Sequence, residues 1–297
     1  MTKDFVQSGL VVVCGANGFT GRFVCKELQK RGINFIALVR PHNDITWLEK
    51  NCIRTRFADL NNSNQLEKSI NDCYALINIA SLGFGSVSTI LKACKKVGIK
   101  RTIFVSTTGI FTKLNNKSKS IRLDAEDQIK KSDLNYTIIR PTMIFGSIGD
   151  RNIVKLISWI HRFPVIPVFN KGNAIQQPIF VQDLAWAIVS SFESNKTINK
   201  TFNIAGSRPI TFNEMIDEIS KVFKKKVLRI SINAKIAIMI IFILKTLKFK
   251  LPISEEQIKR VVEDKKFSNE QAFKLINFKP REFDYIVRKE IKEYLNS

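Results

Sequence analysis

Three glycines at fixed spacing, between an apolar run and a helical pattern, constrain the fold of this chain most strongly. The apolar residues Val11–Cys14 predict a buried strand, and residues 23–28 follow with helical periodicity. Between them, Gly15 allows a tight turn, Gly18 lets a pyrophosphate approach the backbone, and Gly21 lets the helix pack closely on the strand. The unit therefore predicts a dinucleotide phosphate site at the N-terminus of the first helix.

Apolar runs alternate with helical patterns through the first half of the chain. This alternation implies a parallel sheet with helices on both faces, and ligands at the carboxyl ends of its strands. We predict an α/β fold, a Rossmann-type doubly wound parallel sheet with a smaller C-terminal substrate lobe. The predicted strands span 34–40, 53–57, 75–80, 102–106 and 136–140, and the predicted helices 64–70, 87–97 and 118–131.

The second half of the chain is less regular. Residues 1–150 are predicted to form mainly the dinucleotide-binding domain and residues 151–297 mainly the substrate lobe, with parts of 176–205 returning to the sheet. Thr211 and Glu214 form a capping box that opens a helix at 212–223. The other predicted elements are helices 152–162, 182–192, 268–276 and 283–295, and strands 177–181, 201–205 and 227–230.

The composition narrows the classes of partner and compartment. The net charge is +22, which concentrates anions at the surface, although a bias toward Lys, Ile, Asn and Phe throughout the chain explains it equally well. No nucleic-acid-binding motif stands out, so we expect no nucleic-acid partner. Two histidines and five cysteines without close pairs predict no metal site and reduced thiols. We expect a cytoplasmic protein without a signal peptide, with the inner face of a membrane as an alternative location.

Further motifs follow the glycine run in a specific order. Together they resemble the short-chain dehydrogenase/reductase superfamily over nearly the whole chain, and most closely its extended and atypical branch of epimerase/dehydratase-like proteins. The motifs are Gly15-Ala16-Asn17-Gly18-Phe19-Thr20-Gly21, Ala58-Asp59-Leu60, Asn78-Ile79-Ala80-Ser81, Phe104-Val105-Ser106-Thr107, Tyr136-Thr137-Ile138-Ile139-Arg140-Pro141, Phe180-Val181-Gln182-Asp183-Leu184-Ala185 and Phe202-Asn203-Ile204-Ala205-Gly206.

The resemblance implies that the N-terminal domain binds NAD or NADP. It assigns the pyrophosphate to the glycine turn, the adenine to the third strand, the cofactor path to the fourth strand and the nicotinamide to the sixth. In that order, the implied cofactor-binding residues are Gly15, Asn17, Gly18, Phe19, Thr20 and Gly21, then Asp59 and Leu60, then Ala80 and Ser81, and finally Pro141 and Met143.

The residue at the end of the second strand predicts which dinucleotide is bound. An acid there would accept hydrogen bonds from the ribose 2′-OH and favour NAD. Here the position is Arg40, whose guanidinium can pair with a 2′-phosphate. We therefore predict NADP in preference to NAD. The alternative is that Arg40 stacks on the adenine or is merely exposed.

The catalytic pattern implied by the resemblance is broken. The superfamily places a Ser or Thr after the fifth strand, here Ser106 or Thr107, and a Tyr–Lys pair on the next helix. Alignment on Glu126 puts Ser118 at the tyrosine and Arg122 at the lysine. We predict Ser106 and Thr107 as substrate-contacting hydroxyls and Arg122 as a cofactor holder, with Ser118 beside it. Asp124, Glu126 and Asp127 are expected on an exposed helix face.

An apolar segment interrupts the basic C-terminal lobe. Residues 236–244 are uniformly apolar, and the surrounding residues 221–260 carry eleven Lys or Arg and two Glu, a local net charge of +9. Nine residues are too few to cross a bilayer. Our preferred interpretation is a helix buried against the sheet or a partner subunit, which leaves a homodimer open. Peripheral membrane contact through 236–250 is the alternative.

Three functions are consistent with these patterns. The resemblance implies an NAD(P)-dependent oxidoreductase or epimerase acting on a nucleotide-activated sugar, in surface polysaccharide biosynthesis; Arg151, Arg162, Lys171 and Arg208 are candidate phosphate partners. A reductase of a lipid-like ketone would suit the apolar lobe. A non-catalytic NADP-binding sensor or accessory subunit would explain the missing Tyr–Lys pair.

Overall fold

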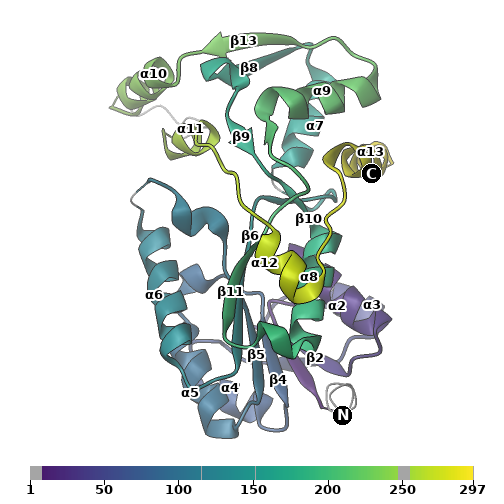
Figure 1. Cartoon of the computed structure of the whole chain (residues 1–297), viewed down its shortest axis with the longest axis vertical. Helices are drawn as coiled ribbons and strands as arrows, with labels where there is room; N and C mark the ends of the chain where they lie inside the picture. The colour runs from purple at the N-terminus through teal and green to yellow at the C-terminus, as the bar shows by residue number, and fades with distance from the viewer. Residues whose placement is uncertain (1–8, 115, 151, 247–254, 297) are drawn as a thin grey trace.

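The fold is built around one parallel sheet. The computed structural model describes residues 9–114, 116–150, 152–246 and 255–296 (Figure 1). Seven strands pair in the order β11-β6-β5-β4-β1-β2-β3, and every pairing is parallel. Apart from β11, the six strands β1 to β6 have the order of doubly wound dinucleotide-binding folds, which confirms the predicted fold class. The strands are β1 (Val11–Cys14), β2 (Phe35–Val39), β3 (Thr55–Phe57), β4 (Ala75–Asn78), β5 (Arg101–Val105), β6 (Tyr136–Pro141) and β11 (Lys200–Ile204).

Helices cover both faces of this sheet (Figure 1). Because side chains alternate along a strand, Val11 and Val13 of β1 join one core while Val12 and Cys14 join the other. The first core is closed by α2 (Phe19–Lys30), α3 (Thr46–Lys50), α8 (Val181–Glu193) and α12 (Glu270–Ile276). The second is closed by α4 (Ser63–Ile70), α5 (Val87–Val97) and α6 (Lys117–Lys131).

The C-terminal lobe has a core of its own beyond the carboxyl ends of the strands. Its central residues include Phe145, Ile157, Ile216 and Ile286, all 0–1% exposed. Thr211 and Glu214 form the predicted capping box. The elements around this core are β7 (Ile144–Phe145), α7 (Ile153–Arg162), β8 (Val165–Phe169), β9 (Ile175–Gln176), β10 (Ile179–Phe180), β12 (Ile210–Thr211), α9 (Phe212–Phe223), β13 (Leu228–Ile232) and α13 (Phe283–Leu295).

Two further helices, α10 (Ala234–Thr246) and α11 (Glu255–Val261), pack against each other in the lobe. Ala234 and Ile241 of α10 pack against Ile258 of α11. We preferred burial of residues 236–244 against the sheet or a partner subunit. Burial against the sheet is wrong, because α10 packs on α11 and its outer face is exposed. Burial against a partner subunit stays a prediction. Residues 247–250 of the predicted membrane segment lie outside the described residues. In the parts of the chain that are described, no helix combines the length and apolarity needed to cross a membrane.

Candidate functional site

The glycine turn has the geometry of a phosphate-binding loop. Gly15 adopts a φ of +81°, and a Cβ there would lie 2.7 Å from the backbone nitrogen of Ala80. A Cβ on Gly21 would lie 2.0 Å from the carbonyl oxygen of Gly15, so α2 could not pack as closely on the turn. Gly18 is exposed and caps α2, which has no acid in its first turn. The first N–H groups of α2 therefore remain available to an anion.

A second loop reaches the glycine turn from the end of β2. The side-chain amide of Asn17 donates to the carbonyl oxygen of Asp44, and Arg22 donates to the backbone and side-chain oxygens of Asn17, both at 3.1 Å. Arg40 opens this loop, and its carbonyl oxygen accepts from the Asn43 backbone N–H at 3.3 Å. The residue is exposed, and its side chain makes no hydrogen bond or ion pair with the described residues. Its guanidinium is therefore free to meet a phosphate beside the turn. Arg22 adds a second positive charge beside the glycine turn. The sequence motifs did not predict Arg22 as a site residue.

The acid in this second loop is already engaged. The Asp44 carboxylate accepts hydrogen bonds from the Thr46 backbone N–H at 2.9 Å and from its hydroxyl at 2.6 Å. These bonds from Thr46 hold the pKa of Asp44 below its ordinary value. Asp44 is thereby committed to Thr46 rather than free for a ribose hydroxyl.

The other residues predicted to bind the cofactor all lie at the carboxyl edge of the sheet. Asp59 and Leu60 follow β3, and the Asp59 carboxylate accepts from the Asn61 backbone N–H at 2.9 Å. Pro141 is the last residue of β6, and Met143 follows it, with its carbonyl accepting from Ile179 at 2.8 Å. These positions fit an extended dinucleotide along the sheet edge. Their individual roles stay predictions.

Arg122 connects two elements at this edge. Its guanidinium donates to the hydroxyl of Ser118, one turn back on α6, and to the hydroxyl of Ser81, after β4, at 3.3 Å. Burial, with the positive charge of Arg260, lowers the pKa of Arg122. An arginine nevertheless stays charged in a protein and does not exchange protons near neutral pH. The cluster of Ser81, Ser118 and Arg122 can thus bind hydroxyl groups but cannot act as an acid or a base.

A buried ion pair lies under the next turn of α6. The Glu126 side chain is 2% exposed and accepts hydrogen bonds from Arg140 Nε at 2.9 Å and from the Ser106 hydroxyl at 2.6 Å. The expectation that Glu126 lies on an exposed helix face with Asp124 and Asp127 is therefore wrong, although those two are exposed. Its partner is a strand residue 14 positions later, which helix spacing could not reveal.

This ion pair also fixes Ser106, whose hydroxyl proton is used in the bond to Glu126. The Thr107 hydroxyl accepts from the Gly109 backbone N–H at 3.1 Å and caps the turn Thr108–Phe111. Neither residue contacts Ser118 or Arg122 among the described hydrogen bonds. The predicted catalytic residues thus fall into two groups rather than one relay.

The C-terminal segment covers this part of the site. The Glu263 carboxylate accepts from the Thr112 hydroxyl at 2.7 Å and from the Lys113 backbone N–H at 2.6 Å, across about half the chain. Behind it, burial lowers the pKa of Lys265, whose Nζ donates to the carbonyl oxygen of Arg260 at 2.6 Å. No local motif marked Glu263 or Lys265, because their partners are so distant in the sequence.

The usual proton-transfer side chains lie elsewhere. Of the four tyrosines, Tyr74 and Tyr136 stand at the amino ends of β4 and β6, opposite the site, and Tyr285 and Tyr294 are on α13. His161 is on α7, where its ring stacks on Phe223 with centroids 5.0 Å apart. The other histidine, at position 42, is in the exposed loop after β2.

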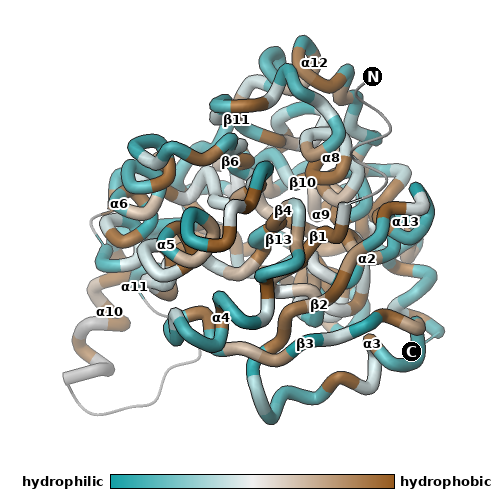
Figure 2. Tube along the Cα trace, turned by 90° about the horizontal axis from the view of Figure 1, so that it is seen from below, coloured by the Kyte–Doolittle hydropathy of each residue, from teal (hydrophilic) through white to brown (hydrophobic). Residues whose placement is uncertain are grey.

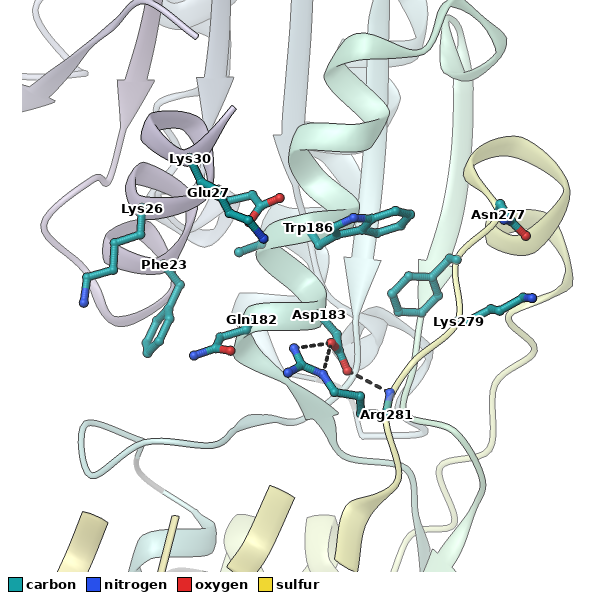
Figure 3. Close-up of a pocket in the computed structure, with 12 residues that line it drawn as sticks. Phe23, Lys26, Glu27, Lys30, Gln182, Asp183, Trp186, Asn277, Lys279 and Arg281 are labelled. Carbon is teal, nitrogen blue, oxygen red and sulfur yellow. Dashed lines mark hydrogen bonds and ion pairs between the residues drawn. The ribbon is translucent and has the colours of Figure 1, made fainter. Parts of the chain in front are cut away.

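A groove of about 550 Å³ lies elsewhere, along α2 and α8 (Figure 3). Figure 3 shows Asp183 of α8 bonded to Arg281, and the Arg281 Nε donates to the carboxylate at 2.7 Å. None of the residues predicted to bind cofactor or substrate lines this groove. It is therefore separate from the site at the carboxyl edge of the sheet.

Comparison with known proteins identifies the family that the N-terminal half of the chain matches. Residues 15–154 match the family described as NAD(P)H-binding. The chain is similar to subunit 9 of the NADH dehydrogenase [ubiquinone] 1 alpha subcomplex of Dictyostelium discoideum, with 29% identity over 71% of this chain and 64% of that protein. It is also similar to the divinyl chlorophyllide a 8-vinyl-reductase of Arabidopsis thaliana, with 29% identity over 66% of this chain and 53% of that protein.

A third relative is the ceramide reductase of Caulobacter vibrioides, with 26% identity over 61% of this chain and 60% of that protein. The chain thus spans less than two thirds of the length of these relatives. Among solved structures, the UDP-glucose 4-epimerase of Thermotoga maritima, determined with UDP-glucose, superposes with a TM-score of 0.76 and 14% identity. That match covers 97% of this chain and 99% of the epimerase, and it shows the shared fold.

Proposed function

We propose that the chain binds NADP(H) and holds it with Arg122, because residues 15–154 match the NAD(P)H-binding family and the fold is shared with a UDP-glucose 4-epimerase. The observation behind this proposal is that the Arg122 guanidinium donates hydrogen bonds to Ser118 and to Ser81. Arg122 aligns with the superfamily's lysine and Ser118 with its tyrosine. The glycine turn fits a pyrophosphate, because Gly18 is exposed at a helix N-terminus. When bound, the cofactor would supply or accept a hydride.

Binding without the superfamily's usual turnover follows from the same residues. A serine hydroxyl has no useful acidity without a base, and Arg122 cannot remove its proton. Loss of a positioned acid or base costs roughly 10²–10⁴-fold in rate. We therefore place the chain with cofactor-binding sensors or accessory subunits rather than with epimerases. The relationship to a subunit of NADH dehydrogenase supports this class.

The preference for NADP(H) over NAD(H) rests on Arg40. Its free guanidinium can form a charge-assisted pair with a 2′-phosphate. Calorimetric titration with NADPH and NADH should give at least about tenfold tighter binding of NADPH, and Arg40→Ala should remove most of this difference. The matched control is Arg54→Ala, because Arg54 is exposed just before β3, at the amino ends of the strands and so opposite the site. Equal loss of both cofactors in Arg40→Ala would refute the 2′-phosphate assignment.

The replacement of the superfamily's Tyr–Lys pair by Ser118 and Arg122 has its own test. The wild type should bind NADPH without changing its absorbance at 340 nm in the presence of a panel of ketones and sugar nucleotides. In the double variant Ser118→Tyr/Arg122→Lys, which restores the superfamily's pair, any accepted ketone should be reduced faster by roughly 10²-fold or more. Rapid NADPH consumption by the wild type would contradict a role in binding alone.

A second candidate function is the reduction of a lipid-like ketone, favoured by Lys265. Burial lowers the pKa of this lysine, so it gives up a proton more readily than an exposed one. Its Nζ donates to the Arg260 carbonyl oxygen at 2.6 Å, and Glu263, two residues before it, holds this segment against Thr112. In this candidate function, Lys265 would donate a proton to the developing alkoxide. The similarity to a ceramide reductase supports this class. Lys265→Met should then abolish turnover, while Lys266→Met, which changes an exposed neighbour, should not.

A nucleotide sugar, the substrate class implied by the resemblance, has less support. Arg208 is paired with Glu214 at 2.9 Å, and Arg151 lies outside the described residues. Fold likeness to an epimerase at 14% identity does not extend to its ligand. The nucleotide sugar, the polysaccharide pathway and the homodimer stay predictions from the sequence.

A further inference from the structure

One helix of the C-terminal lobe presents an apolar stripe to solvent. Ile236, Met239, Ile240 and Ile243 of α10 are 47–56% exposed. Their spacing of three, one and three residues places them on one side of the helix. The opposite side packs on α11 through Ile241. We call these four residues the α10 stripe. Figure 2 shows α10 at the periphery of the molecule, reaching away from the central sheet.

The sequence on both sides of the α10 stripe is strongly basic. The residues from 221 to 260 carry a local net charge of +9. Lys224, Lys226 and Lys235 are exposed and have no ion pair within the described parts of the chain. A second apolar surface adjoins this charge, since Leu228 and Ile230 of β13 are 65% and 51% exposed and alternate along the strand. The end of the lobe therefore combines exposed aliphatic side chains with unpaired lysines.

We propose that the α10 stripe lies on the surface of an anionic lipid bilayer. The helix has 13 residues, or about 20 Å, against a hydrocarbon core of about 30 Å, so it can lie in the interface but cannot cross it. Basic residues beside a shallow apolar face are the pattern of interfacial helices. Anionic headgroups attract the exposed lysines, and the aliphatic side chains enter the headgroup boundary.

Charge favours a lipid surface over a second copy of the chain. The whole chain carries a net charge of +22, and pairing two α10 stripes would bring two lysine-rich lobe ends together. Such like-charge contact opposes association, whereas an anionic bilayer neutralises it. The inference does not depend on cofactor binding or turnover. Contact through the α10 stripe would place the bilayer beside α11. This helix is linked to the start of α6, because Glu256 accepts a hydrogen bond from Asn116 at 3.2 Å.

Cosedimentation of the full chain with vesicles tests this inference. At about 50 mM salt, most of the protein should pellet with phosphatidylcholine vesicles that contain about 30% phosphatidylserine. Binding should fall at least about tenfold with phosphatidylcholine alone or at about 500 mM salt. Failure to pellet with the anionic vesicles at low salt would overturn the inference.

Variants assign the contact to the α10 stripe. Ile236→Ser/Met239→Ser/Ile240→Ser should reduce vesicle binding at least about tenfold, while the melting temperature and NADPH affinity stay unchanged. The matched control Phe273→Ser/Leu295→Ser removes exposed apolar side chains from α12 and α13 and should bind like the wild type. Equal binding by the triple variant would overturn the inference.

Two further outcomes are decisive. If the triple serine variant does not fold, Lys224→Glu/Lys226→Glu/Lys235→Glu replaces it, and its vesicle binding should also fall at least about tenfold. Undiminished binding by that variant would overturn the inference. A concentration-dependent dimer by light scattering, lost in the triple serine variant and without vesicle binding, would assign the α10 stripe to a second copy instead.

Discussion

Removal of Glu126 should destabilise the whole protein, because its buried carboxylate is the partner of a largely buried cation. Arg140 is 15% exposed and Glu126 is 2% exposed. Within the described structure, Glu126 has one other ion pair, a long one with Lys130 at 3.8 Å. In Glu126→Leu, the Arg140 guanidinium and the Ser106 hydroxyl both lose their carboxylate partner inside the protein. The desolvation of Arg140 is then no longer compensated.

The expected cost is roughly 3–5 kcal/mol, the range for breaking a buried pair by removing one partner. This is a large part of a typical unfolding free energy of about 5–15 kcal/mol. The double variant Glu126→Leu/Arg140→Met removes both charges and should be considerably more stable than Glu126→Leu. The control Asp127→Leu breaks an exposed pair with Lys131 and should cost at most about 1 kcal/mol.

Urea unfolding of five proteins, followed by circular dichroism at one pH and salt concentration, measures these differences: the wild type, Glu126→Leu, Arg140→Met, the double variant and Asp127→Leu. The double variant's cost should be less than the sum of the costs of Glu126→Leu and Arg140→Met alone. A cost below about 1 kcal/mol for Glu126→Leu, or simple additivity in the double variant, would refute the description of this pair as buried and coupled.

Three other changes follow from single residues. Gly21→Ala would place a Cβ 2.0 Å from the Gly15 oxygen and 2.6 Å from that of Ala16, so both the melting temperature and NADPH affinity should fall; an unchanged melting curve would contradict the close packing. Burial raises the pKa of Glu290 to about 10, so unfolding releases its proton between about pH 4.5 and 10. The free energy of unfolding of the wild type should therefore fall as pH rises through that window, by up to about 1.4 kcal/mol per pH unit. Glu290→Gln removes this titration, so its stability relative to the wild type should increase between pH 6 and 9 in urea unfolding, and a constant difference would be inconsistent with a buried neutral Glu290. Arg122→Ala should weaken NADPH binding about tenfold or more by calorimetry, whereas Arg122→Lys should retain most of it; equal affinity in Arg122→Ala would remove Arg122 from the cofactor site.

Local patterns were sufficient to predict the central sheet. Val11–Cys14 is apolar throughout because a strand in a parallel sheet is buried on both faces, and the glycine spacing identified the first turn. β8 was not predicted, because Pro167 lies within it, and a proline normally argues against a strand. It is tolerated here since β8 pairs with β13 alone in a two-stranded sheet.

The site was harder to predict than the sheet. The positions of Ser118 and Arg122 followed from alignment of Glu126 with the superfamily's pattern, and the structure places them one turn apart with their side chains bonded. Glu126 was misplaced because its partner Arg140 lies on another element. Glu263 reaches Thr112 across 151 positions, a contact that no local pattern encodes. The exposure of α10 was also missed, since an apolar helix is usually covered within its own chain.

A crystal structure of the chain soaked with NADPH tests the central claim most directly. We predict the pyrophosphate over Gly18, the 2′-phosphate within about 3 Å of the Arg40 guanidinium, and the nicotinamide ribose hydroxyls on Arg122, without a tyrosine or histidine beside the nicotinamide. A cofactor bound away from the Gly15–Gly21 turn, or a tyrosine or histidine within hydrogen-bond reach of the substrate position, would contradict the account.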